Sequence, residues 1–211
     1  MTFVLIHGAA SDSWYWHLLV PELEARGHEV IAPDLPSDDD SAGLDEYADA
    51  VVEAVGDRTD LVLVAQSLAG FTAPLVCDRL PVKLLIMLAA MIPSPGEAPS
   101  DWWANTGYPE IDGDLLEKFF HDVPADVRAA AMARGERDQS GTPMIKPWPL
   151  AAWPDVPTKF LLCSEDRFFP ADYLRRVVKD RLGIVPDEMP SGHLPALAHP
   201  KLLADHLESY L

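Results

Sequence analysis

The sequence contains few cysteines and few basic residues. Only Cys77 and Cys163 occur among 211 residues, too few for a disulfide framework, and both lie in apolar segments, as reduced thiols usually do. Lysine and arginine total 16 against 34 acidic residues, which gives a formal net charge of −18. A field of that sign repels phosphate backbones and anionic lipids, so it disfavours nucleic acid or a membrane surface as a partner.

Long hydrophobic runs and metal-binding patterns are also missing. No apolar run approaches the roughly 18 residues of a membrane span, and the chain enters Thr2–Ile6 without the basic segment of a signal peptide. Histidine and cysteine do not cluster as zinc ligands do, so we expect neither a metal nor a cofactor. A composition of 48% hydrophobic and 24% charged residues is typical of a globular chain, and we expect a cytoplasmic protein with one domain and a modest insertion.

Short apolar segments alternate with segments of helical periodicity. The apolar segments lack polar alternation, which is typical of strands buried on both faces of a parallel sheet. Together they predict a doubly wound, mainly parallel α/β sheet with right-handed crossovers. The expected strands are Thr2–Ile6, Glu29–Ala32, Asp60–Ala65, Lys83–Leu88, Thr158–Cys163 and Ile184–Glu188. The expected helices are Leu18–Arg26, Leu44–Val55, Leu68–Arg79, Ala171–Leu182 and Pro200–Leu211.

Residues 93–157 interrupt this alternation. The interval has no strand pattern, many prolines and several large aromatic residues, and it is too long for a plain loop. We expect two short helices in it, Gly113–His121 and Ala125–Arg134. The interval is therefore interpreted as a lid inserted into a core of residues 1–92 and 158–211, over the carboxyl edge of the sheet. Its aromatic side chains could equally form a small core of the insertion itself.

A serine lies where the third predicted strand meets a helix. Ser67 follows Gln66 directly, and a hydroxyl at so sharp a junction is exposed above the sheet, with the amide of Leu68 directed at any oxyanion formed there. The places two residues before and after the serine, where glycine is expected, hold Ala65 and Ala69. An alanine forced to positive φ there would cost on the order of 1 kcal/mol. Taken alone, the junction could equally be a helix N-cap.

Two other strand ends carry a base and a carboxylate. Of seven histidines, His193 alone follows the last strand in a glycine-containing loop, while the others are interpreted as solvated or packed. Asp166 follows strand Thr158–Cys163, one strand–helix–strand step before His193, so the two loops should be neighbours. Glu165 is the competing carboxylate, and we prefer Asp166 because Glu165 is longer and nearer the strand. A carboxylate here would hold the imidazole in the tautomer that accepts a serine proton.

The first strand offers a second donor for an oxyanion. It ends in His7–Ala10, a turn of small residues whose amides can face Ser67. Two preorganised amides make acyl transfer fast, and losing one typically costs about 2.7–4 kcal/mol in kcat. Four such features at four strand ends are far less expected by chance than any one alone, so together they predict an acyl-transfer site.

These segments resemble the α/β-hydrolase superfamily, in particular the small bacterial relatives of its plant methylesterase and hydroxynitrile-lyase branch. The resemblance spans nearly the whole chain and implies six parallel strands rather than eight. It implies that Ser67 is the nucleophile, His193 the general base and then acid, and Asp166 the orienting carboxylate. It also implies an oxyanion hole formed by the amides of Ala9 and Leu68. The resembling segments are Phe3–Ala9, Trp14–Val30, Ala32–Pro36, Gln66–Gly70, Glu165–Pro170 and Gly192–His193.

The resemblance predicts a serine esterase that acts on a small to medium hydrophobic carboxylic ester, with a thioester, lactone or amide less favoured. A small-molecule ester is the only partner expected, and the oligomeric state is not indicated. The aromatic residues of the lid are candidates for the substrate pocket. They are Trp102, Trp103, Phe119, Phe120 and Trp148.

Two alternatives remain open. A receptor-like binding protein could keep this fold with a silent serine, and the alanine-bordered elbow favours it. A lyase or cyclase could use the same site. The lyases that resemble this chain carry a threonine in the first-strand loop and a lysine after the base histidine. Here these places hold Gly8 or Ala9 and Leu194, so hydrolysis is preferred.

Overall fold

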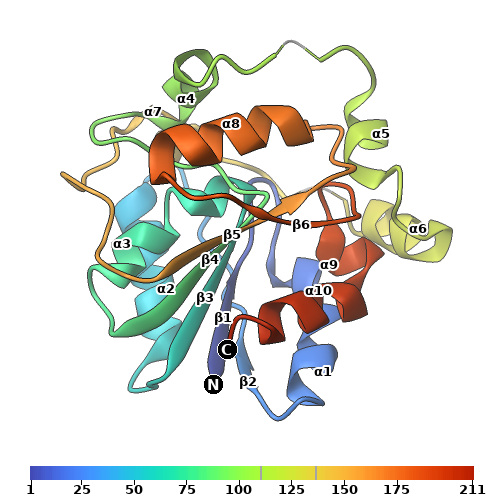
Figure 1. Ribbon diagram of the computed structural model, residues 1–211, viewed down its shortest axis with the longest axis horizontal. Coiled ribbons are helices and arrows are strands. Elements are labelled where there is room, and N and C mark those ends of the chain that lie inside the picture. The colour runs from blue at the N-terminus through green and yellow to red at the C-terminus, as the bar shows by residue number, and fades with distance from the viewer. Residues whose placement is uncertain (110, 136) are drawn as a thin grey trace.

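A six-stranded parallel sheet forms the centre of the molecule (Figure 1). The computed structural model describes residues 1–109, 111–135 and 137–211. The strand order is β2-β1-β3-β4-β5-β6, and every neighbouring pair is parallel. The strands are β1 (Thr2–Ile6), β2 (Glu29–Ile31), β3 (Leu61–Gln66), β4 (Val82–Leu88), β5 (Thr158–Cys163) and β6 (Asp187–Met189). The predicted six-stranded α/β fold is thereby confirmed.

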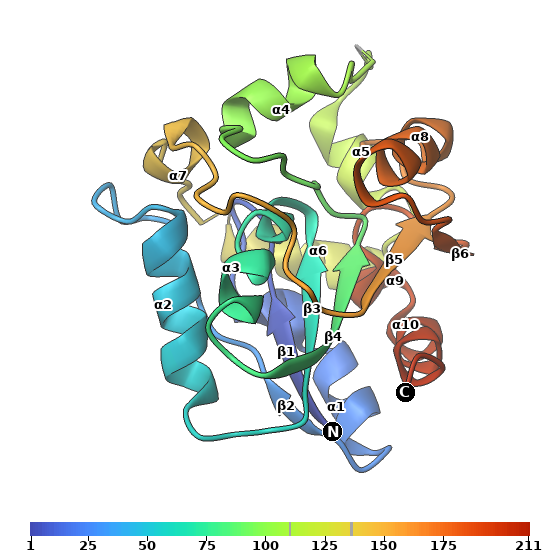
Figure 2. The same cartoon turned by 60° about the vertical axis from the view of Figure 1, so that its left-hand side comes forward.

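Both faces of the sheet are covered by helices, because successive strand residues point to opposite faces. Val4 and Ile6 pack into one hydrophobic cluster, while Phe3 and Leu5 pack into the other. Figure 2 shows α2 (Leu44–Val55) and α3 (Ala73–Cys77) on one side of the sheet and α1 (Leu19–Glu24) and α10 (Pro200–Glu208) on the other. The cluster with Val4 and Ile6 contains residues of α2, α3 and α8 (Ala171–Leu182). The cluster with Phe3 and Leu5 contains residues of the 3₁₀ helix η1 (Ser13–Trp16) and of α1, α9 (Pro195–Ala198) and α10.

Residues 93–157, which we call the cap, lie between β4 and β5 in the sequence. Most of the described part of this segment lies beyond the carboxyl ends of the central strands, and the chain then returns to the start of β5 (Figure 2). Two of the cap helices fall where helices were predicted, and the other two were not predicted. Each of the two unpredicted helices has a proline in its first turn. Proline favours the start of a helix because its ring already fixes φ near the helical value. The cap helices are α4 (Pro99–Asn105), α5 (Leu115–Phe120), α6 (Ala125–Arg134) and α7 (Thr142–Ile145).

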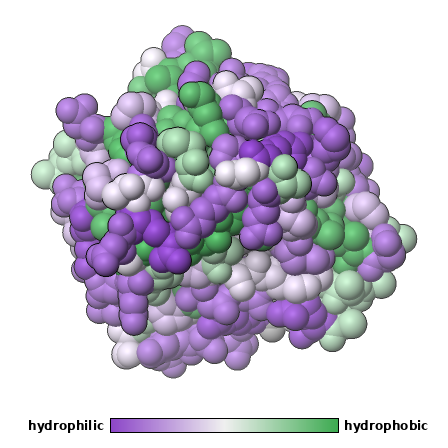
Figure 3. Space-filling view, turned by 90° about the horizontal axis from the view of Figure 1, so that it is seen from below, coloured by the Kyte–Doolittle hydropathy of each residue, from purple (hydrophilic) through white to green (hydrophobic). Residues whose placement is uncertain are grey.

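The surface seen in Figure 3 is mostly hydrophilic, with small hydrophobic patches between the polar residues. Within the described ranges, no helix combines the length and the apolar character needed to cross a membrane.

A buried ion pair ties the cap to α8. The side chains of Arg181 and Glu97 are 13% and 4% exposed, and Arg181 Nη2 donates to Glu97 Oε1 at 2.8 Å. Burial raises the pKa of the Glu97 carboxyl, but hydrogen bonds from Arg181 and Asn105 outweigh burial and hold the pKa below its ordinary value. Glu97 is therefore ionised, and its charge depends on Arg181 for compensation.

Replacing Arg181 by methionine is expected to lower the free energy of unfolding by about 3 kcal/mol, because Glu97 would stay buried without its partner. Urea denaturation of the two proteins measures the difference. Arg175→Met is the matched control, since Arg175 pairs with Glu188 on the exposed side of the same helix and should cost less than about 1 kcal/mol. Equal losses in both variants would contradict a special role for the buried pair.

Candidate active site

A cavity of about 450 Å³ lies at the carboxyl ends of the strands, between the sheet and the cap. It is lined by the loops that follow β1, β3 and β6 and by residues of the cap. Ligand sites of open α/β sheets lie at this edge. Of the predicted catalytic and oxyanion residues, Ala9, Ser67, Leu68 and His193 are among its lining.

Ser67 is a strained residue at the sharp turn between β3 and the 3₁₀ helix η2 (Ser67–Gly70), with φ of 54°. Backbone conformations of this kind cost about 1–3 kcal/mol and cluster at active sites. The positive φ falls on the serine, so the strain expected at Ala65 and Ala69 is absent, which corrects that part of the sequence interpretation. The position that requires glycine is Gly70, where a Cβ would collide with the carbonyl oxygen of Met91.

His193 and Asp166 form a buried pair. Their side chains meet at 2.7 Å between His193 Nδ1 and Asp166 Oδ2, and the residues are 1% and 5% exposed. Asp166 Oδ1 accepts the backbone N–H groups of Phe168 and Phe169 at 2.7 and 2.8 Å. With Nδ1 donating to this fixed carboxylate, Nε2 is the ring nitrogen that can accept a proton. Glu165, the competing carboxylate, is exposed.

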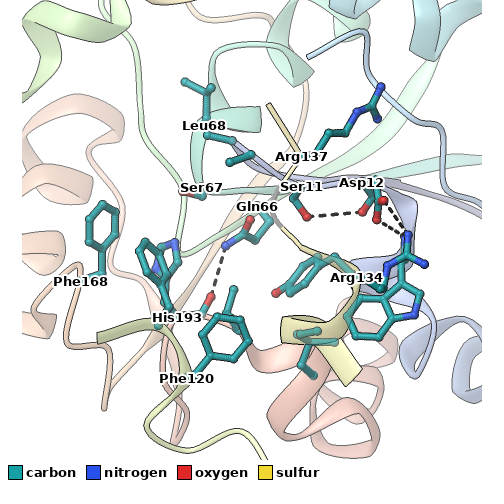
Figure 4. Close-up of a pocket in the computed structure, with 18 of the residues that line it drawn as sticks. Ser11, Asp12, Gln66, Ser67, Leu68, Phe120, Arg134, Arg137, Phe168 and His193 are labelled. Carbon is teal, nitrogen blue, oxygen red and sulfur yellow. Dashed lines mark hydrogen bonds and ion pairs between the residues drawn. The ribbon is translucent and has the colours of Figure 1, made fainter. Parts of the chain in front are cut away.

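Ser67 and His193 face the same cavity, and Figure 4 shows them on the same side of it. Gln66, which the sequence did not indicate as a site residue, donates from Nε2 to the carbonyl oxygen of His193 at 3.2 Å and so joins the two loops. The structure contains no hydrogen bond between the Ser67 hydroxyl and the described ring of His193. Contacts of this kind often form only around a bound substrate, so the arrangement is compatible with proton transfer.

The loop after β1 approaches the serine closely. A Cβ on Gly8 would lie 2.5 Å from Gln66 Oε1 and 3.0 Å from Ser67 Cβ, so a larger residue there would displace the Gln66 side chain. The next residue is Ala9, whose amide is one candidate oxyanion donor. Leu68, the other candidate, is the second residue of η2, and amides in a first helical turn have no acceptor within the helix. Both predicted donors therefore border the cavity, on the two loops nearest Ser67.

His7 holds the loop after β1 in place. Its Nε2 accepts the N–H of Leu35 at 3.0 Å, which leaves the proton on Nδ1 to bond the Gly8 carbonyl at 2.8 Å. Burial lowers the pKa of His7, and this outweighs the opposing effect of the Gly8 carbonyl. The neutral ring is thus the form that the folded protein requires, and His7 has the packing role that the sequence assigned to it.

Lowering the pH below about 6.5 is expected to destabilise the fold through His7, because the unfolded chain then binds a proton that the folded ring resists. Stability should fall by up to about 1.4 kcal/mol per pH unit for this one group. Urea denaturation between pH 7.5 and 5.5 measures the slope. The variant His7→Gln cannot titrate and should show a smaller slope, and an unchanged slope would assign the effect to other groups.

The aromatic pocket candidates divide into two sets. Trp103, Phe119 and Phe120 line the cavity, as expected from the sequence. Phe168 also lines it and was not predicted. The ring of Phe168 packs at 5.1 Å from that of His193. This side of the cavity is an aromatic wall around the general-base candidate.

Trp102 and Trp148 do not line the cavity, contrary to the sequence expectation. They are 0% and 2% exposed and belong to the core cluster on the α2–α3–α8 side of the sheet. Each indole N–H donates to a main-chain carbonyl, that of Ile92 for Trp102 and that of Phe71 for Trp148. Their bulk and their satisfied N–H groups make them anchors of the cap.

The opposite side of the cavity is polar (Figure 4). Arg134, at the end of α6, donates to Asp12 Oδ2 at 2.9 Å and lies over the indole of Trp14 at 5.2 Å. Arg137 pairs with Asp38 at 3.0 Å. Sequence reasoning missed these residues, because their partners lie about a hundred positions away. The cavity thus combines an aromatic end with a polar end. The described residues contain no group of three potential metal ligands.

Comparisons with known proteins identify the family of this chain. The family model described as "Alpha/beta hydrolase family" matches residues 3–206. Methylesterase 2 of Arabidopsis thaliana is 25% identical over 97% of this chain and 94% of its own length. The alpha-hydroxynitrile lyase of the same plant is 23% identical over 98% of this chain and 95% of its own. The crystal structure of a pyrethroid hydrolase from Sphingobium faniae has a TM-score of 0.80 and 23% identity, and covers 100% of this chain and 96% of that one.

Proposed function

This chain belongs to the alpha/beta hydrolase family, and on that premise we propose that it is a serine hydrolase of small to medium hydrophobic carboxylic esters. The observation that carries the proposal is the buried 2.7 Å contact between His193 and Asp166 beside the cavity that Ser67 lines. An ester is the favoured substrate because relatives of this chain are named methylesterase and pyrethroid hydrolase.

In the first half of the proposed reaction, Ser67 Oγ attacks the carbonyl carbon of the ester and its proton passes to His193 Nε2. The amides of Ala9 and Leu68 stabilise the negative charge that develops on the carbonyl oxygen. The bond to the alcohol oxygen then breaks, Nε2 returns the proton to that oxygen, and an acyl ester remains on Ser67.

In the second half, a water molecule attacks the acyl ester while His193 Nε2 takes one of its protons. The bond between Ser67 Oγ and the acyl carbon breaks, and the proton returns to Oγ. The acid leaves, and one water has been consumed for each ester cleaved. In both halves the negative charge of the Asp166 carboxylate stabilises the positively charged imidazolium of His193.

The aromatic end of the cavity supports a hydrophobic group on the substrate. The rings of Phe119 and Phe168 pack against the ring of His193, and Phe120 also lines the cavity. An apolar acyl or alcohol group placed there would be removed from water. Burying a methylene contributes about 0.8 kcal/mol. For p-nitrophenyl esters, kcat/KM is expected to rise by up to about fourfold per added methylene until the aromatic end is full. A kcat/KM that does not change with the chain length of the acyl group would contradict an apolar acyl site.

Lyase chemistry is the competing reaction, because a hydroxynitrile lyase is among the relatives. Leu194, the residue after the base, lines the cavity and brings no positive charge to hold a cyanide leaving group. Hydrolysis in ¹⁸O-labelled water distinguishes the two reactions. Hydrolysis transfers one labelled oxygen to the acid product, whereas a lyase leaves the label in the solvent.

A further inference from the structure

The loop that carries His193 is held at several points by the core. Gln66 donates to the His193 carbonyl, and the N–H of Glu165 donates to the Ser191 carbonyl at 3.0 Å. Asp166 fixes the ring itself. These contacts come from the end of β3 and the loop after β5. The cap adds the aromatic packing of Phe119 on His193 and a polar contact to the residues that precede His193.

That contact is made by Asp122, in the cap between α5 and α6. Its Oδ2 accepts the N–H of Gly192 at 2.6 Å and the hydroxyl of Ser191 at 3.2 Å. The Asp122 side chain is 11% exposed. Hydrogen bonds to an ionised acceptor are roughly twice as strong as neutral ones. The carboxylate therefore holds the main chain one residue before His193.

The cap packs closely against Gly192. A Cβ on Gly192 would lie 2.5 Å from Asp122 Oδ1 and 2.7 Å from His121 Nε2. A side chain at position 192 would therefore displace Asp122 or His121, because these two cap side chains lie directly against the main chain of the loop.

The other neighbours of Asp122 do not account for its burial. Two histidines face the carboxylate, His121 with Nε2 at 4.0 Å and His199 with Nε2 at 3.6 Å, and both distances exceed hydrogen-bond length. Asp122 Oδ1 is buried without a hydrogen bond in the part of the chain that the structure describes. Both hydrogen bonds of the carboxylate go to the two residues that precede His193.

We infer that Asp122 is a positioning residue: it fixes the histidine loop from the cap so that His193 Nε2 stays directed at Ser67. The inference rests on the proposed function, which gives His193 its role as base. It makes the cap part of the catalytic geometry as well as a wall of the pocket. A displacement of about 1 Å at a reacting group can cost about 100-fold in rate, so the contact is expected to influence kcat.

The test compares Asp122→Ala with Asp122→Asn. The alanine variant loses both hydrogen bonds to the loop and should lower kcat by about 30- to 100-fold, with KM changed less than about threefold. The asparagine variant keeps an oxygen acceptor for the Gly192 N–H and should stay within about fivefold of the parent. Glu46→Ala is the matched control, because Glu46 also accepts a main-chain N–H, that of Gly43 at 2.7 Å, but lies on α2 outside the cavity.

Two measurements separate positioning from a loss of stability. The rate at which a fluorophosphonate modifies Ser67 should fall in Asp122→Ala as kcat does, at a temperature where thermal denaturation shows each variant folded. The Nδ1 proton of His193, protected beside Asp166 in the parent, should broaden through solvent exchange in Asp122→Ala and stay sharp in Glu46→Ala. An unchanged kcat in Asp122→Ala, or asparagine as damaging as alanine, would overturn the inference.

Failure of the inference differs from failure of the proposed function. If the parent protein neither hydrolyses esters nor reacts with the fluorophosphonate, the proposed function fails. The proton signal of His193 still decides in that case whether Asp122 orders the loop. If the parent is active and Ser67→Ala is not, an Asp122→Ala variant with parental kcat and a sharp signal refutes the inference alone.

Discussion

Replacing Ser67 by alanine is expected to lower kcat/KM for ester hydrolysis by about 10⁴-fold or more. Without Oγ no acyl-enzyme forms, and what remains is the effect of binding and of the oxyanion donors on direct attack by water. The two hydrogen-bonded partners, His193 and Asp166, do not depend on Ser67 for their 2.7 Å contact, so the rest of the site should persist. Initial rates on a p-nitrophenyl ester measure the loss, and circular dichroism verifies the fold.

Covalent labelling gives the same prediction a second readout. A fluorophosphonate should modify the parent protein once, at Ser67, and should not modify Ser67→Ala. Ser41→Ala serves as control because Ser41 is exposed and is not part of the cavity lining, and the variant should be labelled and active like the parent. Folded parent protein that is never labelled at neutral pH would contradict the nucleophile and favour the receptor-like alternative.

The central strands and the long helices could be predicted because their burial follows a regular pattern along the sequence. Residues of β1 and β3 are buried on both faces of the sheet, so their sequences are apolar without alternation. The helices Leu44–Val55 and Ala171–Leu182 have the predicted bounds, because each has an apolar stripe and a glycine just beyond its end. Local sequence carries both signals.

The helix after Ser67 was predicted as one segment, and the structure divides it. The 3₁₀ helix η2 ends at Gly70 and α3 begins at Ala73. Gly70 lies against the main chain of Met91, so the backbone there follows a tertiary contact with the loop after β4. Helical periodicity does not report a contact of that kind.

The candidate site shows the same difference between features that local sequence indicates and features that depend on tertiary contacts. The placement of Ser67, Asp166 and His193 near one another was predictable, because strand ends can be read from sequence and parallel strands place those ends at one edge. Gln66 and Asp122 were not predicted as site residues, since each acts through a hydrogen bond to the histidine loop from a distant part of the chain, 127 and 70 positions away. Only the folded chain brings those partners together.

Replacing Asp166 by asparagine is expected to lower kcat by about 10⁴-fold with little change in the shape of the site. Two main-chain N–H groups, from Phe168 and Phe169, point at Oδ1. They require an oxygen there, so the amide of asparagine must place its NH₂ group at the position of Oδ2, facing His193 Nδ1. The ring then has to accept at Nδ1 and carry its proton on Nε2, which makes it unable to take the proton of Ser67. Stopped-flow measurement of the acylation step tests this directly.

Glu165→Gln is the control for Asp166→Asn, because it makes the same chemical change at the neighbouring residue, whose side chain is exposed. It should keep kcat within about twofold of the parent, since its main-chain N–H still donates to Ser191. If Glu165→Gln were the damaging variant, the wrong carboxylate would have been assigned. If Asp166→Asn retained parental kcat, the tautomer of His193 would not limit the reaction, and the proposed proton transfer between Ser67 and His193 would fail with it.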